Sequence, residues 1–357
     1  MFLENYSKIL KKVDKALLTF LKDKSGSIHD PGFLQYFYQE IEKFLFSGGK
    51  RIRPILMYFS SAAIDPTIDK DAIIKASLSL ELLHNASLIH DDIMDNAETR
   101  RGLIAFHKTL ADYSKQYYKN LIQNPDDFGI AMGILGGDFL YNLAYNAIKV
   151  EEFSSEKVVE ASLEFNQGFF KVVRGVIIET DYMSKFTISE DEYIEMVEGK
   201  TAALFESAAK MGAILAGAEK TQIKGLGDFA RTAGIAFQIV DDIIGTFGDS
   251  EQTGKPNDSD LKEGKKTLLL IKTIEKLDEN HREIIKKIIG NRNSTPEEIE
   301  QIRNMIIDKG SLEYSRKCAE KLYDDCVGYL ENIRPPLNKK YKNFLLELAK
   351  MGIHREK

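Results

Sequence analysis

Apolar side chains recur with the helical period of about 3.6 residues along nearly the whole chain, and this pattern most constrains the fold. Convincing stretches of alternating apolar and polar residues, which would indicate strands, are absent, and only 8 prolines interrupt 357 residues. The breaks between periodic segments are short and contain Gly, Pro or Asn. The chain is therefore predicted to be all-α. The periodic segments are 34–46, 55–63, 71–96, 130–149, 156–178, 190–217, 221–244, 264–275, 281–289, 296–307, 311–332 and 340–350.

Helix-start signals agree with this pattern. Ser189 is followed three residues later by Glu192, which makes a possible capping box, and Asp71 precedes the apolar run AIIKASLSLELLH. The polar, tyrosine-rich stretch 108–129 is predicted to be a surface excursion. No break is strong enough to divide the chain, so we predict one large helical domain over 1–357.

Composition excludes several classes of protein. The net charge of -6 gives no reason to expect nucleic acid as a partner. Charged residues break the apolar runs well short of the roughly 18–20 residues that span a bilayer, and the N-terminal 20 residues resemble an amphipathic helix rather than a signal peptide. We predict a soluble, cytoplasmic protein without stable membrane insertion. Cys318 and Cys326 lie about 12 Å apart along a helix, too far for a disulfide, and are predicted to pack.

Three acids follow an apolar run in LIHDDIMDNAETRRG, residues 88–102. On a helix, Asp91 and Asp95 share one face, and Asp92 lies about 100° away. Like charges at that spacing cost roughly 0.2–0.5 kcal/mol per pair, and more near apolar neighbours. Such a cluster suits Mg²⁺, which takes only one or two protein carboxylates and fills its other positions with water and phosphate oxygens. The arginine pair that follows could hold the same phosphates.

The alternative interpretation is a solvated acidic face, which is common for a single cluster. A second cluster weakens it. In FQIVDDIIGTFGD, Asp241 and Asp242 again follow an apolar helical run. Two such pairs in apolar settings are unusual in one chain, so metal binding becomes the stronger hypothesis.

Cationic residues cluster in SGGKRIRP, where Lys50, Arg51 and Arg53 follow two glycines. Backbone N–H groups and cationic side chains there could face one anion, although a simple turn with a solvated basic end would look the same. His84, two turns before the first acids, is a plausible diphosphate contact. For His90 a structural hydrogen bond is as plausible as any chemical role.

Further cations lie in the second half of the chain. Lys200 and Thr201 fall inside an apolar helix, where a lysine either reaches the surface or points into a cavity holding an anion. Lys255, Lys265 and Lys266 lie in a glycine-containing loop after the second acids, where they could simply be solvated. Two acid clusters and several cationic spots in a helical, apolar protein indicate a site for diphosphates on apolar substrates.

The ordered motifs GGKRIRP, HDDIMD with RRG, GGDFL, GKTAALF, FQIVDDIIGTFGD, TGKP and SDLKEGKKTL resemble the trans-isoprenyl diphosphate synthases, or polyprenyl synthetases. The resemblance is closest to archaeal-type farnesyl and geranylgeranyl members and covers about residues 40–270. It implies an all-α bundle around a central cavity, usually in a homodimer, with the two aspartate motifs facing each other across the cavity. It also implies three Mg²⁺ ions per active site.

The resemblance carries residue roles over by motif. The expected Mg²⁺ ligands are Asp91, Asp95 and Asp241, which form the catalytic set together with Lys200. The expected contacts of the allylic diphosphate are Arg100, Lys200, Thr201, Gln238, Lys255 and Lys265. The expected contacts of isopentenyl diphosphate are Gly49, Lys50, Arg53, His84 and Arg101.

The activity that this resemblance implies is head-to-tail condensation of isopentenyl diphosphate with an allylic diphosphate. A terpene cyclase would also carry the first acid motif, but it needs no second diphosphate site, and GGKRIRP is intact here. A non-catalytic subunit of a heteromeric synthase typically loses one aspartate motif, and both are present. These two alternatives are therefore weaker.

The sequence departs from the family at the second motif, where Gly245 replaces a third aspartate, and at Val176 and Glu179, which replace the usual GQxxD pattern. Metal binding at the second motif should therefore rely on Asp241.

Product length in the family depends on residues that precede the first aspartate. Here Ala86 and Ser87 are small, at positions where a bulky residue would close the tunnel and limit the enzyme to short products. Leu83 and Leu80 lie deeper on the same face. We predict geranylgeranyl diphosphate or a longer product, unless the small residues merely allow close helix packing.

Overall fold

The structure is a computed structural model that describes residues 2–25, 32–119, 121–248 and 258–354. Most of these residues are helical, which confirms the all-α prediction. The only strands among them are β1 (Thr99–Arg100) and β2 (Leu103–Ile104), an antiparallel pair. The sequence did not predict this hairpin because two residues are too few to show an alternating pattern.

The chain divides into two compact units: Met1–Tyr58 with Thr67–Ser162, and Phe59–Pro66 with Leu163–Lys357. The prediction of a single domain over 1–357 therefore stays a prediction. No helix of the described chain has both the length and the apolar character that a membrane span requires.

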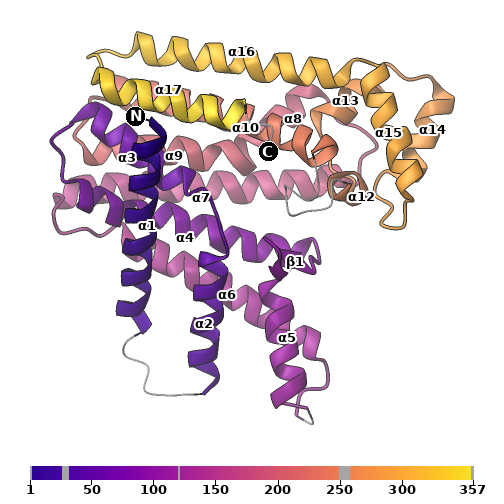
Figure 1. The fold of residues 1–357 in the computed structure, drawn as a ribbon, viewed down its shortest axis with the longest axis horizontal. Helices are drawn as coiled ribbons and strands as arrows, with labels where there is room; N and C mark the ends of the chain where they lie inside the picture. The colour runs from indigo at the N-terminus through magenta and orange to yellow at the C-terminus, as the bar shows by residue number, and fades with distance from the viewer. Residues whose placement is uncertain (1, 26–31, 120, 249–257, 355–357) are drawn as a thin grey trace. The chain divides into compact units, whose positions relative to one another are not determined.

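The first unit is built around α4, which packs against α6 and α1, while α5 packs against α6 and α2 (Figure 1). The expected excursion at 108–129 forms most of α5 and the start of α6. A Cβ atom at Gly137 of α6 would lie 2.0 Å from Nε2 of His90 on α4, so this glycine permits the close approach of the two helices. The helices of this unit are α1 (Phe2–Ser25), α2 (Phe33–Phe46), the first half of α3 (Ile52–Ile64), α4 (Lys70–Met94), α5 (Phe106–Tyr117), α6 (Pro125–Ala147) and the first residues of α7 (Ser155–Met183).

Two helix starts test the sequence signals. The capping box at Ser189 and Glu192 is present, with both side chains bonded to backbone N–H groups. The N-cap of α4 is Asp69, whose carboxylate accepts from the N–H groups of Asp71 and Ala72, so Asp71 lies inside the first turn. Both acids complement the positive end of the helix dipole.

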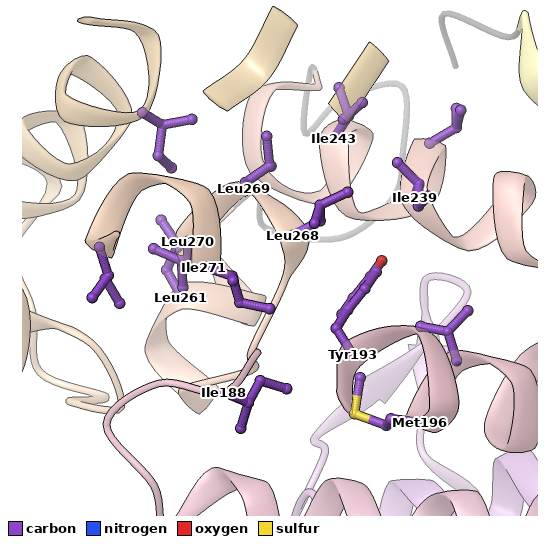
Figure 2. Packing of buried hydrophobic residues seen from close by; sticks show 14 of the residues in the cluster. Ile188, Tyr193, Met196, Ile239, Ile243, Leu261, Leu268, Leu269, Leu270 and Ile271 are labelled. Carbon is purple, nitrogen blue, oxygen red and sulfur yellow. The ribbon is translucent and has the colours of Figure 1, made fainter. Parts of the chain in front are cut away.

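In the second unit, α10 packs against α16, α9 and α17, and Figure 1 shows α16 and α17 running side by side. Its apolar core includes Tyr193, Ile239 and Leu268 (Figure 2). Cys318 and Cys326 are free thiols, as expected. The remaining elements are α8 (Glu190–Val197), the π-helix η1 (Glu198–Ala202), α9 (Ala203–Leu215), α10 (Lys220–Phe247), α12 (Ser259–Glu263), α13 (Leu268–Ile274), α14 (Glu279–Ile288), α15 (Pro296–Asp308), α16 (Ser311–Asn332) and α17 (Lys339–Ile353).

Candidate functional site

The first acid cluster lies at the C-terminal end of α4. Asp91 is in the last turn, the helix ends at Met94, and Asp95 is the C-cap, whose backbone N–H donates to the Asp91 carbonyl at 2.8 Å. The C-terminal end of a helix carries partial negative charge, so the helix dipole destabilises carboxylates there in addition to their mutual repulsion. This placement is unfavourable by itself and indicates that cations offset it.

The three carboxylates have different surroundings. Asp92 is fully buried, and its Oδ1 accepts hydrogen bonds from Arg100, with Nε at 2.7 Å and Nη2 closer still. Burial alone would lower the pKa of Arg100, but the bond to Asp92 and the charges of Asp91 and Asp95 raise that pKa above its ordinary value. Asp91 and Asp95 are partly exposed, so they are the pair that can reach a ligand in solution.

This acidic end fits a divalent cation that brings some of its own ligands. In the part of the chain that the structure describes, no three His, Cys, Asp or Glu side chains are placed to hold a metal ion by themselves. Mg²⁺ commonly takes one or two carboxylates and completes its shell with water and phosphate oxygens. Asp91 and Asp95 supply that number, and Oδ2 of Asp92 is a buried acceptor to which no described group donates. The donor set suits Mg²⁺ bound together with a phosphate.

In the loop at residues 47–51, which contains two glycines, the neighbouring cations Lys50 and Arg51 have different surroundings. The guanidinium of Arg51 is buried, with Nε 2.9 Å from Oδ1 of Asp14 and Nη1 2.7 Å from Oε1 of Glu81. Lys50 is exposed. Arg51 is therefore bonded inside the protein and holds the loop, whereas the adjacent Lys50 lies at the surface.

The predicted contacts of isopentenyl diphosphate come together in the first unit. Nη1 of Arg101 donates to the carbonyl of Gly48 at 2.8 Å, and Gly49 lies close to the same guanidinium. Burial, and then the charges of Arg53 and Arg101, hold the pKa of His84 well below its usual value. His84 is therefore neutral at pH 7 and can donate a hydrogen bond to a phosphate oxygen without adding positive charge.

In the second unit a chain of hydrogen bonds surrounds the second acid pair. Asp242 is buried, accepting from the Tyr193 hydroxyl at 2.7 Å and from Nε2 of Gln238 at 2.8 Å. Oε1 of Gln238 in turn accepts from the Thr201 hydroxyl at 2.7 Å. Asp241 is exposed. One acid of the pair is thus committed to internal bonds, and the other faces outward.

The missing third acid of this motif has a structural explanation. A Cβ atom at Gly245 would lie 2.5 Å from Oδ2 of Asp260 on α12, so the Asp260 carboxylate occupies the space beside that glycine. Oδ1 of Asp260 accepts from Nζ of Lys265 at 3.1 Å. The third carboxylate near this motif therefore comes from another element. Asp260 was not among the predicted site residues, although it is the aspartate of the motif SDLKEGKK.

Lys200 and Thr201 lie in the π-helix η1, a backbone form often found at functional sites. A Cβ atom at Gly175 of α7 would lie 2.2 Å from the backbone N of Lys200, so only glycine allows this approach. Nζ of Lys200 donates to the Glu179 carboxylate. The departure from the usual family motif therefore still supplies an acid, which orients the predicted allylic lysine.

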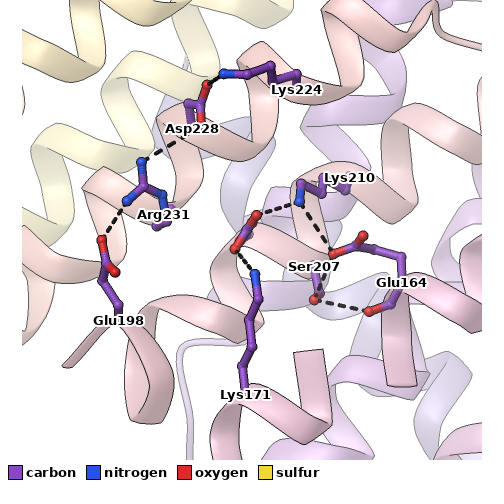
Figure 3. Close-up of polar contacts among 9 residues, drawn as sticks. Glu164, Lys171, Glu198, Ser207, Lys210, Lys224, Asp228 and Arg231 are labelled. Carbon is purple, nitrogen blue, oxygen red and sulfur yellow. Dashed lines mark hydrogen bonds and ion pairs between the residues drawn. The ribbon is translucent and has the colours of Figure 1, made fainter. Parts of the chain in front are cut away.

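Ion pairs continue along the interface between α7 and α9 (Figure 3). Lys171 lies 2.7 Å from Glu206, which also pairs with Lys210, and the Ser207 hydroxyl lies 3.3 Å from Oε1 of Glu164. Burial would raise the pKa of Glu206, but its lysine partners lower the pKa below the usual value. These pairs fix how α9 sits on α7, and so where its N-terminal neighbour η1 lies.

The lysines after the second motif differ in their contacts. Lys265 pairs with Asp260 and with Glu263, the latter at 2.7 Å. Lys266 is buried and donates to the Gly264 carbonyl at 2.6 Å, an internal bond at the end of α12. Lys255 lies outside the described residues.

The predicted chain-length residues all lie on α4. Leu80, Leu83 and Ala86 are buried, and the Ser87 hydroxyl donates to the His84 carbonyl at 2.8 Å. Their role in setting product length stays a prediction.

The buried Asp242 should make stability depend on pH. Burial, followed by the charge of Asp260, raises the pKa of Asp242 from 3.8 to about 7. The native protein then holds a proton that the unfolded chain lacks, so the stabilisation is complete below pH 3.8 and is lost as the pH rises to about 7. Urea unfolding in EDTA should show this loss, and Asp242→Asn should flatten the profile. Equal slopes for the two proteins would show that Asp242 does not titrate in this range.

Comparisons with known proteins show which family this chain resembles in sequence and in fold. A family model described as polyprenyl synthetase matches residues 34–306. The chain is 35% identical over 289 residues to a geranylgeranyl diphosphate synthase of Sulfolobus acidocaldarius, covering 80% of this chain and 81% of that one. It is 32% identical to the corresponding synthase of Saccharolobus solfataricus, covering 99% and 97%. A geranylgeranyl pyrophosphate synthase from Corynebacterium glutamicum, solved with isoprenyl diphosphate and magnesium, superposes with a TM-score of 0.90 at 27% identity, covering 98% and 99%.

Proposed function

Because the chain belongs to the polyprenyl synthetase family, we propose that it is a Mg²⁺-dependent trans-prenyltransferase. It joins isopentenyl diphosphate head-to-tail to an allylic diphosphate and makes an all-trans prenyl diphosphate of geranylgeranyl length or longer. The observation that carries this proposal is the acidic end of α4, where Asp91 and Asp95 stand against the helix dipole beside Arg100. The archaeal relatives are named geranylgeranyl diphosphate synthases, which supports the choice of product.

The two diphosphates would be held by different groups of residues. Isopentenyl diphosphate would be held by the cationic group of the first unit, which consists of Lys50, Arg53 and Arg101. Neutral His84 would add a hydrogen bond without adding charge. The allylic diphosphate would be held by Arg100, Lys200, Thr201, Gln238, Lys255 and Lys265. The cofactor would be Mg²⁺, three ions per active site, with Asp91, Asp95 and Asp241 as ligands.

The chemistry follows from this charge distribution. Bound Mg²⁺ would supply Lewis-acid stabilisation of the departing diphosphate. Lys200 and Lys265 add positive charge at the same leaving group, so the allylic C–O bond ionises to a delocalised carbocation. The isopentenyl double bond attacks this cation, and a proton lost to the released diphosphate restores an alkene. The protein contributes position and electrostatics, which explains why no nucleophile and base pair stands out.

Two other functions fit the observations less well. A terpene cyclase would leave the group formed by Lys50, Arg53 and Arg101 without a ligand. A non-catalytic subunit would not need both an exposed Asp241 and a partly exposed Asp91. The deciding experiment is to incubate the protein and Mg²⁺ with radiolabelled isopentenyl diphosphate and C5, C10 or C15 allylic primers, then dephosphorylate and size the products. No elongation of any primer would refute the proposed function.

Substitution of Arg53 tests which residues bind isopentenyl diphosphate and which bind the allylic diphosphate. A charge-assisted hydrogen bond contributes roughly 1.5–3 kcal/mol, so Arg53→Ala should raise the Michaelis constant for isopentenyl diphosphate by about 10- to 150-fold. The constant for the allylic substrate should change little, and Lys200→Ala should show the opposite preference. Steady-state kinetics with each substrate varied in turn would measure both. Equal effects on the two substrates would show that the sites are misassigned.

Exchanges on α4 test the control of product length. Because Ala86 and Ser87 are small, they do not close the product tunnel near the first aspartates. Leu83 lies one turn deeper, at a distance of about 5 Å along the helix axis, which is close to the length of one isoprene unit. Ala86→Phe should therefore shorten the product, and Leu83→Ala should lengthen it. Chromatography of the dephosphorylated products measures this. If both variants keep the wild-type distribution, Ala86 and Ser87 serve helix packing and length is set elsewhere.

We also propose that the protein acts as a homodimer. On α7, Leu163, Phe170 and Ile177 recur every seven residues and are 62%, 66% and 64% exposed. Large apolar side chains exposed along one face commonly mark a protein–protein interface. Sedimentation equilibrium should give twice the mass of the chain, and a monomer mass would refute the proposal. The cytoplasmic location stays a prediction.

A further inference from the structure

The loop at residues 47–51 has a backbone that needs support from outside. Gly48 and Gly49 both have φ of +129°, and Arg51 has φ of +49°, which is unfavourable for a residue with a side chain. Glycine adopts positive φ readily, whereas the conformation of Arg51 persists only where surrounding groups over-determine it. Since Gly49 and Lys50 are the proposed contacts of isopentenyl diphosphate, whatever holds this backbone also sets the geometry of that site.

Much of the support comes from helix α1. The Tyr6 hydroxyl donates to the Lys50 carbonyl, and Oδ1 of Asp14 accepts from Nε of Arg51 at 2.9 Å. Burial, and then the charge of Glu81, raises the pKa of Tyr6 to about 12, so the hydroxyl keeps the proton that it donates. Two side chains of one helix thus bond to two consecutive residues of the loop.

Helix α1 is itself firmly seated. Its residues Ile9, Val13, Leu17 and Leu21 recur every four positions and are all buried, at 0–5% exposure. The helix packs against α4. It also lies before residue 34, where the match to the family model begins. The contacts of Tyr6 and Asp14 are therefore additions to the motif residues from which the site was predicted.

We propose that α1 is a positioning element of the isopentenyl diphosphate site, in which Tyr6 and Asp14 hold residues 47–51 in the conformation that presents Gly49 and Lys50 to the diphosphate. This inference rests on the proposed function. Tyr6 and Asp14 are positioning residues that act through the loop and do not touch substrate. A helix that only stabilised the unit would affect both substrates alike when its contacts are weakened.

The test compares Tyr6→Phe, Asp14→Asn and the double variant with Lys12→Ala. The control removes an exposed ion pair of the same helix, Lys12 with Asp71, and leaves the loop contacts intact. Loss of one or two hydrogen bonds should raise the Michaelis constant for isopentenyl diphosphate by about 3- to 30-fold in the double variant. The constant for the allylic substrate and kcat should stay within about twofold, because the allylic contacts are unaltered. Asp14→Glu, which keeps the carboxylate, should lie closer to wild type than Asp14→Asn.

Calorimetric binding of isopentenyl diphosphate without the allylic substrate gives a second readout. Binding should weaken by the same factor by which the Michaelis constant rises, while the circular dichroism spectrum stays that of the native protein. The inference is overturned if the folded double variant binds isopentenyl diphosphate like wild type, or if both Michaelis constants rise together. If the double variant does not fold, Tyr6→Phe alone decides, since it removes a single hydroxyl. A wild-type protein that binds isopentenyl diphosphate but does not condense it would instead contradict the proposed function.

Discussion

Asp91→Ala and Asp241→Ala should each lower turnover by several orders of magnitude while leaving the helical fold intact. Each exchange removes a proposed Mg²⁺ ligand, and with it stabilisation of the charge that develops on the departing diphosphate. Stability should be unchanged or slightly higher for Asp91→Ala, because the exchange relieves repulsion at the end of α4 and the conflict with the helix dipole. Steady-state kinetics at saturating Mg²⁺ and urea unfolding of the same preparations measure the two effects.

Glu98→Ala is the matched control, because Glu98 is an exposed acid close in sequence to the first cluster and forms an ion pair with Lys108. It should retain near-normal turnover. Near-normal turnover of Asp91→Ala would contradict the metal assignment. If turnover fell strongly in Asp91→Ala but not in Asp241→Ala, the metal ligands would be confined to the first unit.

Arg51→Met should destabilise the protein by about 3–5 kcal/mol, the usual result of removing one partner from a buried ion pair. The side chains of Arg51 and Glu81 are each only 3% exposed, and their bond of 2.7 Å is the main compensation for the buried Glu81 charge. Without Arg51, Glu81 keeps the amide of Asn85 at 2.9 Å as a neutral partner. Urea unfolding followed by circular dichroism measures the difference.

Two comparisons make the cause of this loss clear. The double variant Arg51→Met with Glu81→Met should recover much of the stability, because the buried Glu81 charge is also removed and the remaining partner of Arg51, Asp14, is 35% exposed and reaches water. Lys12→Met removes a surface pair whose side chains are 47% and 76% exposed and should change stability by less than about 1 kcal/mol. If Arg51→Met were no worse than Lys12→Met, the buried pair would not be the element that holds this loop.

The sequence by itself determined the helical class and the identity of the chemical groups. Apolar periodicity is a local property, and it placed nearly all of the long helices, because a helix of this length is specified by which of its own faces is apolar. The acids at 91, 92, 95, 241 and 242 stood out for an equally local reason, since nothing adjacent neutralises them. The hairpin at 99–104 escaped prediction because its strands are too short to show a period.

Only the tertiary structure decided which member of each charged group faces inward. Asp92, Asp242 and Arg51 are buried and bonded, whereas their neighbours Asp91, Asp241 and Lys50 are exposed to varying degrees. The partners that make the difference lie far away in the chain: Glu81 is 30 residues from Arg51, and Tyr193 is 49 residues from Asp242. A charge can be buried only where packing brings it a complementary group. Adjacent residues of the same charge therefore take buried or solvent-facing positions because of contacts that no local pattern contains.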